Sequence, residues 1–191
     1  MSLGLYYDVR NVVLDNIFQV LVISIPIYLI FLLINKSICK KTYVKKYMYI
    51  VEFALIGYII SVLIITEVFS SNLFNATFKL TPNLIPLITT LTDLIQYPGS
   101  VLFQVILNMI FFIPFGFILM FFSINEYKLI KILSSAFIFS SIVEMAQYFS
   151  GRYADIDDVI WNTLGALVGI IIFKLLQKIF KSKFSKINFQ V

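Results

Sequence analysis

Five long apolar runs constrain this chain more than any other feature of its sequence. A helix needs about 20 mostly apolar residues to cross the hydrocarbon core of a bilayer, and each run comes close to that length. The runs therefore predict an all-α fold, a polytopic transmembrane helical bundle with about five spans. They cover approximately residues 17–34, 47–66, 101–122, 132–149 and 158–176.

The composition supports a membrane protein. Of the 191 residues, 60% are hydrophobic and 13% are charged, whereas a soluble domain carries about a quarter charged residues. The absence of histidine excludes Ser-His and Cys-His nucleophiles and His-ligated metals. The single cysteine, Cys39, excludes an internal disulfide and a thiolate metal site. We expect no cofactor and no metal.

Residues 82–97 do not fit this pattern of spans. Their apolar part, residues 84–95, is interrupted and short for a full crossing. A segment of this length fits an interfacial or re-entrant element. We expect it on the outer side, either lying on the outer leaflet or dipping into it.

The distribution of basic residues predicts the orientation. Apart from Arg10, Lys79 and Arg152, every lysine and arginine falls in a loop or tail on one side of the five-span arrangement. Positive charge favours the cytoplasmic side. We therefore expect a multi-pass protein of the cytoplasmic membrane with its N-terminus outside and its C-terminus inside. The net charge of +5 is explained by these flanking lysines, so we expect no nucleic acid partner.

Polar side chains interrupt the last three runs. At about 1.5 Å per helical residue, those in different spans reach a similar depth in the outer leaflet. Polar groups at such a depth are costly, and each needs a partner or a purpose. We interpret them as a candidate ligand-binding cluster. Its members are Asn108, Glu144, Gln147, Arg152, Asp155, Asp158 and Asn162.

A second pattern points to close helix packing. Gly165 and Gly169 form a G-x-x-x-G motif, and they continue the helical spacing of Asp155, Asp158 and Asn162. Small residues at this spacing let a neighbouring backbone approach. In the third span, Pro114 leaves one carbonyl without its intrahelical donor, and Gly116 follows it closely. We assign these glycines and this proline to helix packing.

The same polar residues also have structural interpretations. Glu144 would hold three helices together by bonding Asn108 or Asn162. One of the aspartates near Arg152 would cap the fifth span, since aspartate is favoured at a helix N-terminus. The run D-I-D-D, residues 155–158, lacks the ligand spacing of a calcium loop, so a metal site is the weaker interpretation.

The ordered motifs resemble the VanZ-like family, glycopeptide-resistance accessory membrane proteins of Gram-positive bacteria. The resemblance rests on N-M-I-F-F-I-P-F-G from Asn108 to Gly116, on Glu144 with Gln147, and on the stretch from Arg152 to Gly169. N-L-I-P-L at residues 83–87 adds to it. The likeness covers residues 80–173, with two N-terminal spans before it in residues 1–75 and a basic cytoplasmic tail after it in residues 174–191.

The resemblance implies a cell-envelope role with a link to low-level resistance to teicoplanin, a lipid-bearing glycopeptide. Our leading hypothesis is a non-catalytic protein whose polar cluster binds a lipoglycopeptide or a lipid-linked envelope precursor. The alternative is a membrane-embedded enzyme acting on a lipid-linked envelope substrate, with the acids as general acid and base. A transporter is a third reading, disfavoured by the lack of a visible repeat. The oligomeric state stays open.

Overall fold

The computed structural model describes residues 3–36, 46–66, 81–122 and 129–180. Its elements are helices, and no β-strand occurs within these ranges. Five helices are long and apolar enough to cross a membrane: Asn16–Ile34, Tyr47–Ile65, Pro98–Phe122, Leu129–Phe149 and Ile156–Ile179. The predicted fold, a five-span helical bundle, is confirmed, and the chain is a multi-pass membrane protein.

The chain divides into two compact units, Met1–Ile65 and Thr66–Gln190. The first unit holds α1 (Leu3–Ile34) and α2 (Tyr47–Ile65). The Tyr28 hydroxyl donates to the backbone carbonyl of Tyr49 at 2.7 Å, and the rings of Tyr28 and Phe53 lie 5.3 Å apart. Ser24 is buried where α1 passes Gly57 of α2. These contacts join the two helices.

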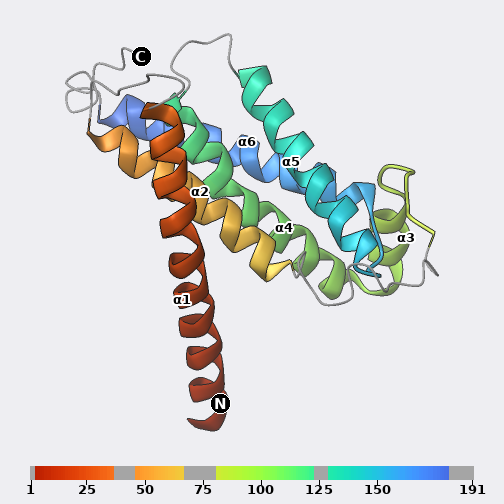
Figure 1. The fold of residues 1–191 in the computed structure, drawn as a ribbon. Coiled ribbons are helices and arrows are strands. Elements are labelled where there is room, and N and C mark those ends of the chain that lie inside the picture. The colour runs from red at the N-terminus through yellow and green to blue at the C-terminus, as the bar shows by residue number, and fades with distance from the viewer. Residues whose placement is uncertain (1–2, 37–45, 67–80, 123–128, 181–191) are drawn as a thin grey trace. The chain divides into compact units, whose positions relative to one another are not determined.

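The second unit holds the other helices, which Figure 1 shows in green to blue. They are α3 (Ile88–Gln96), α4 (Pro98–Leu119) with the short 3₁₀ turn η2 (Met120–Phe122), α5 (Leu129–Phe149) and α6 (Ile156–Ile179). Helix α6 packs most extensively against α4 and then against α5. It continues through residues 174–179, the first part of the expected basic tail.

Glycines bring the backbones of α4 and α6 into direct contact. A Cβ built on Gly165 would lie 2.1 Å from the carbonyl oxygen of Met109, and one on Gly169 would lie 2.1 Å from that of Ile113. From the other side, a Cβ on Gly116 would lie 2.0 Å from the carbonyl oxygen of Ala166. No side chain fits at these three positions, because each is filled by the partner backbone.

Toward the C-terminal end of α6, beyond the glycines, the contacts among α4, α5 and α6 are aromatic and aliphatic. The ring of Phe173 on α6 lies 5.4 Å from that of Phe117 and 4.9 Å from that of Phe121, both in edge-on geometry. Ile132 of α5 and Ile170 of α6 belong to the same buried cluster. This packing fixes the register of the three long helices at one end. The opposite end carries the polar residues.

Some of the expectations concern residues outside the described ranges. They include Cys39, most of the lysine-rich loop after the first span, residues 67–80 and the tail beyond Phe180. The orientation derived from these charges therefore stays a prediction.

Candidate ligand-binding site

The polar end of the second unit, where α5 ends and α6 begins, is built around the cap of α6. Asp155 is the N-cap residue: its backbone is extended, with φ −131° and ψ 123°, and its carboxylate accepts from the amide of Asp157 at 2.9 Å. Asp157 and Asp158 occupy the first turn. Carboxylates are favourable at this position because the first amides of a helix lack partners and carry partial positive charge.

Asn83 attaches the segment before α3 to this cap. Its backbone forms a parallel bridge, in which its amide donates to the carbonyl of Ala154 at 2.9 Å and its carbonyl accepts from the amide of Ile156 at 3.0 Å. Its side-chain amide donates to Asp155 Oδ1 at 2.8 Å and to the hydroxyl of Thr89. Asn83 and Asp155, which are 72 positions apart in the sequence, are thereby held together through both backbone and side chain.

Asp157 holds the start of α3. Its carboxylate, in a residue only 2% exposed, accepts from the amides of Leu87 and Thr90 and from the hydroxyl of Thr90 at 2.7 Å. Leu87 has φ 63°, a left-handed conformation that is uncommon outside glycine. The bond to its amide helps to hold that conformation. The Trp161 indole N–H also donates to the Thr90 hydroxyl, at 3.3 Å.

Glu144 ties the end of α5 to the same cap. Its Oε1 accepts from the backbone amide of Asp155 at 2.8 Å, and the residue is 8% exposed. In the orientation that satisfies both neighbours, the Gln147 amide donates to Glu144 Oε2 at 3.1 Å and its oxygen accepts from the Arg152 guanidinium at 3.2 Å. A turn with Gly151 at φ 83° connects the two helices.

Two further polar pairs join the helices. The Asn108 side chain on α4 donates to Asp158 Oδ1 on α6 at 2.5 Å. The Asn162 side chain on α6 donates to the hydroxyl of Ser140 on α5 at 2.9 Å, and Ser140 is fully buried. Both pairs therefore couple α6 to a neighbouring helix, one on each side.

In the structure, the seven residues of the expected cluster form one hydrogen-bonded network and two side-chain pairs. Glu144, Gln147, Arg152 and Asp155 form one network, whereas Asn108 pairs with Asp158, and Asn162 with Ser140. The expected bond from Glu144 to Asn108 or Asn162 is wrong. The Glu144 carboxylate instead accepts from the backbone amide of Asp155. That amide precedes the helix and has no intrahelical acceptor, so it needs another partner.

The four packing residues also differ from one another. Gly116, Gly165 and Gly169 lie in the α4–α6 contact, where they are buried. Pro114 lies inside α4 with an exposed side chain. It therefore sits on the face of α4 that is turned away from α6.

Two cavities flank Asp155. The larger, about 360 Å³, has an almost entirely apolar wall, and Glu144 and Asp155 are among its lining residues. Among its lining residues are Leu84, Ser141, Met145, Tyr148, Phe149 and Val159. The smaller, about 40 Å³, is polar and is lined by Thr89, Thr90, Asp93, Gln104, Asp157 and Asp158, together with Asp155.

Sequence reasoning missed three residues of this site as individual contributors. Asn83 was recognised only as part of N-L-I-P-L, and Asp157 only as one acid of D-I-D-D. Ser140 lies in an apolar run with nothing to distinguish it from its neighbours Ser134, Ser135 and Ser141. The signal available for Asn83 and Asp157 was the cost of a polar side chain beside a span. In the described part of the chain, no group of three or more acidic or cysteine side chains is arranged to hold a metal ion.

The fold and site together define a multi-pass helical membrane protein with an interlocked polar end. A model of the VanZ/LLP1 family matches residues 53–177. The match covers more than half of the chain, and the protein belongs to the VanZ family. The comparisons found no match among curated proteins and none among solved structures.

Proposed function

We propose that this VanZ-family protein acts at the outer leaflet of the cell membrane by binding a lipid-bearing envelope ligand, and that it confers low-level resistance to teicoplanin. The observation that carries the proposal is the apolar cavity of about 360 Å³, which Glu144 and Asp155 help to line. Its volume falls within the range of small-molecule pockets. An acyl chain suits its apolar wall, and a polar head group suits the two carboxyl groups.

The polar end supports this ligand class because its groups are already positioned. Glu144 and Asp155 are held by the bonds described above, so they need no rearrangement when a ligand arrives. A carboxylate oxygen has two lone pairs, so Glu144 Oε1, which accepts one bond from the amide of Asp155, has capacity for a second donor. Hydroxyl and amine groups of a glycopeptide or of a lipid-linked precursor provide such donors.

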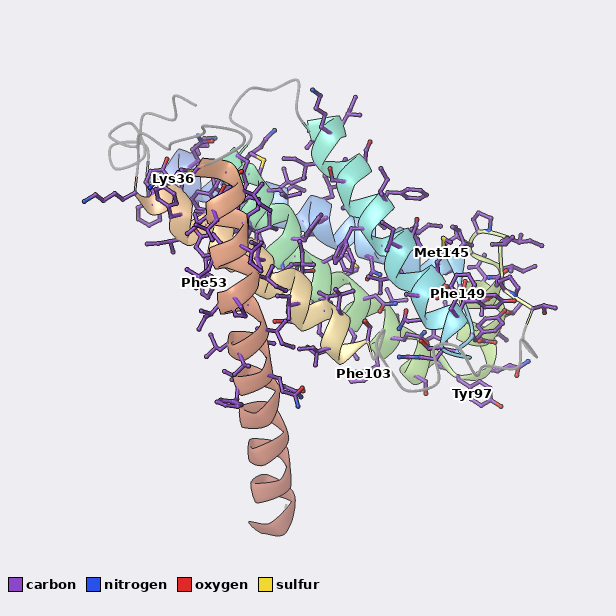
Figure 2. All side chains as sticks on the ribbon, viewed as in Figure 1. Lys36, Phe53, Tyr97, Phe103, Met145 and Phe149 are labelled. Carbon is purple, nitrogen blue, oxygen red and sulfur yellow. The ribbon has the colours of Figure 1, made fainter. Side chains whose placement is uncertain are left out.

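The cavity also opens toward the part of the surface that lipid would cover. Met145 and Phe149, labelled in Figure 2 on the last turns of α5, are 59% and 45% exposed and line the cavity. A ligand dissolved in the leaflet by its acyl chain would approach from this side. Vancomycin lacks the acyl chain of teicoplanin, so the proposal predicts protection against teicoplanin and none against vancomycin.

The test is a susceptibility titration in a sensitive Gram-positive host. It compares vector, wild type and Glu144→Gln at matched membrane abundance, with Glu52→Gln as the control. Glu52 is also a buried carboxylate in an apolar helix, so the control makes the same chemical change in another unit. We expect protection against teicoplanin by wild type and Glu52→Gln, and a loss of protection in Glu144→Gln.

Two results would contradict the proposal. Equal protection by Glu144→Gln and wild type would remove the Glu144 network from the site. Wild-type protection against neither drug would refute the resistance role.

A further inference from the structure

Helix α3 presents three chemically different sides. Ile88, Leu91 and Ile95 follow the spacing of one helical face, and they are 44%, 58% and 85% exposed. Thr92, Asp93 and Gln96 are exposed on another side. Of the helices that the structure describes, α3 is the most strongly amphipathic. In the spans, by contrast, apolar residues are distributed around the whole helix.

The third side of α3 fixes it to the rest of its unit. Thr90 and Leu94, one helical turn apart, are partly buried. The amide and hydroxyl of Thr90 both donate to the Asp157 carboxylate. The helix also packs against α4, which follows it after Tyr97. These contacts fix the orientation of α3 within its unit. They leave both the apolar face and the polar face of the helix exposed.

The length of α3 excludes a membrane crossing. Nine residues extend about 13 Å at 1.5 Å per residue, which is less than half of the hydrocarbon thickness. Helices with separate apolar and polar faces lie in the plane of the membrane, with the apolar face about 5–10 Å into the boundary between head groups and acyl chains. Both properties of α3 match that arrangement.

The apolar surface of α3 continues into a surface that the spans already present to lipid. Leu84, four residues before α3 and 72% exposed, lines the same cavity as Met145 and Phe149 of α5. At the other end, Tyr97 is 63% exposed, and tyrosine is enriched at membrane interfaces. Lipid that contacts the last turns of α5 therefore also meets the segment leading into α3.

We propose that α3 is an in-plane membrane anchor, which inserts Ile88, Leu91 and Ile95 among the lipids of the leaflet where α4 and α6 begin and keeps Thr92, Asp93 and Gln96 in water. Its partner is the bilayer interface, recognised by burial of apolar side chains. The helix carries no lysine or arginine, so anionic lipid is not required. The anchor does not depend on any ligand at the cavity.

The test uses full-length protein with Cys39→Ser, which removes the single native cysteine. Four variants then carry one new cysteine each: Leu91→Cys and Ile95→Cys on the apolar face, and Thr92→Cys and Gln96→Cys on the polar face. Each is spin-labelled and reconstituted into phosphatidylcholine vesicles, with and without phosphatidylglycerol. For each label, the rate of collision is measured once with oxygen, which concentrates in the bilayer, and once with a water-soluble nickel chelate.

The proposal predicts more collisions with oxygen at positions 91 and 95 and more with nickel at positions 92 and 96, equally in both vesicle types. Labelled protein that elutes like wild type from size-exclusion chromatography ensures that the fold is retained. Collisions with nickel at all four positions would overturn the proposal, because α3 would then stand in water. Oxygen alone at all four would also overturn it, since the segment would then be re-entrant. Insertion only in anionic vesicles would contradict recognition by apolar burial.

Discussion

The α1–α2 pair and the α4–α6 pair are similarly apolar, but they are joined by different contacts. The hydropathies of their spans are 2.7 and 2.3 for the first pair and 2.5 and 2.0 for the second. In α2, a Cβ added to Gly57 would meet Ser24 Oγ at 3.8 Å, an ordinary contact. In α6, a Cβ added to Gly165 would overlap the α4 backbone at 2.1 Å.

This difference shows what hydropathy detects and what it does not. It identifies a segment that can enter a bilayer, because that depends on summed transfer free energy. It does not identify the neighbouring helix, because lipid tails are as apolar as leucine and do not drive helices together. The α4–α6 contact depends instead on glycines that allow backbone approach and on polar groups that need partners.

The largest expected effect comes from closing the glycine contact. Gly165→Ala puts a methyl group where the carbonyl of Met109 lies, and the two backbones must separate. Overpacking of this kind costs about 1–3 kcal/mol and occasionally more, and we expect the upper end because backbone atoms are the obstacle. The matched control, Gly57→Ala, has room for its methyl group. The measurement is the midpoint of thermal loss of the monodisperse peak in detergent; equal midpoints for the two variants would contradict the contrast.

A smaller effect is expected from removing the Asp157 carboxylate. Asp157→Ala leaves the amides of Leu87 and Thr90 without their acceptor, and an unsatisfied buried polar group costs about 1–3 kcal/mol. The same change should make residues 81–97 more accessible to protease.

Tyr28→Phe in the first unit removes one hydrogen bond between helices, for which about 0.6 kcal/mol is typical in membranes. If Tyr28→Phe destabilised the protein more than Asp157→Ala, the polar end would not be the more strongly coupled region.

Much of the fold could be predicted from the sequence because each span has its own signal. The boundaries of the apolar runs agree with the membrane-spanning segments to within a few residues, although helix α1 itself begins well before its apolar run, at Leu3. The interruption around 82–97 corresponds to the short helix α3. The glycine spacing indicated a close backbone neighbour but could not identify α4. The neighbour is the helix that has a glycine at the matching level along the interface, as α4 has Gly116 opposite Ala166.

The polar site was less predictable for a related reason. The cost of burying polar groups identifies the residues that need partners, and it indicated Asn108, Glu144 and Asn162. Asn108 pairs with Asp158, another residue of the predicted cluster. The partners of Glu144 and Asn162 are a backbone amide and one serine among several, which carry no sequence signal. Asp155 to Glu144 is an example, because the donor is a main-chain amide that every residue but proline possesses.

The most direct test of the proposed function is to fill the apolar cavity and measure teicoplanin binding. Ser141 of α5 lines the cavity, and Ser141→Phe would occupy it. Ser135→Phe is the matched control, because Ser135 also bonds a carbonyl four residues earlier in α5 but does not line the cavity. Labelled teicoplanin would be titrated onto the purified protein in lipid nanodiscs, with empty nanodiscs and excess vancomycin alongside. The account predicts saturable binding by wild type and Ser135→Phe, undiminished by vancomycin and lost in Ser141→Phe; binding by Ser141→Phe as tight as wild type would contradict it.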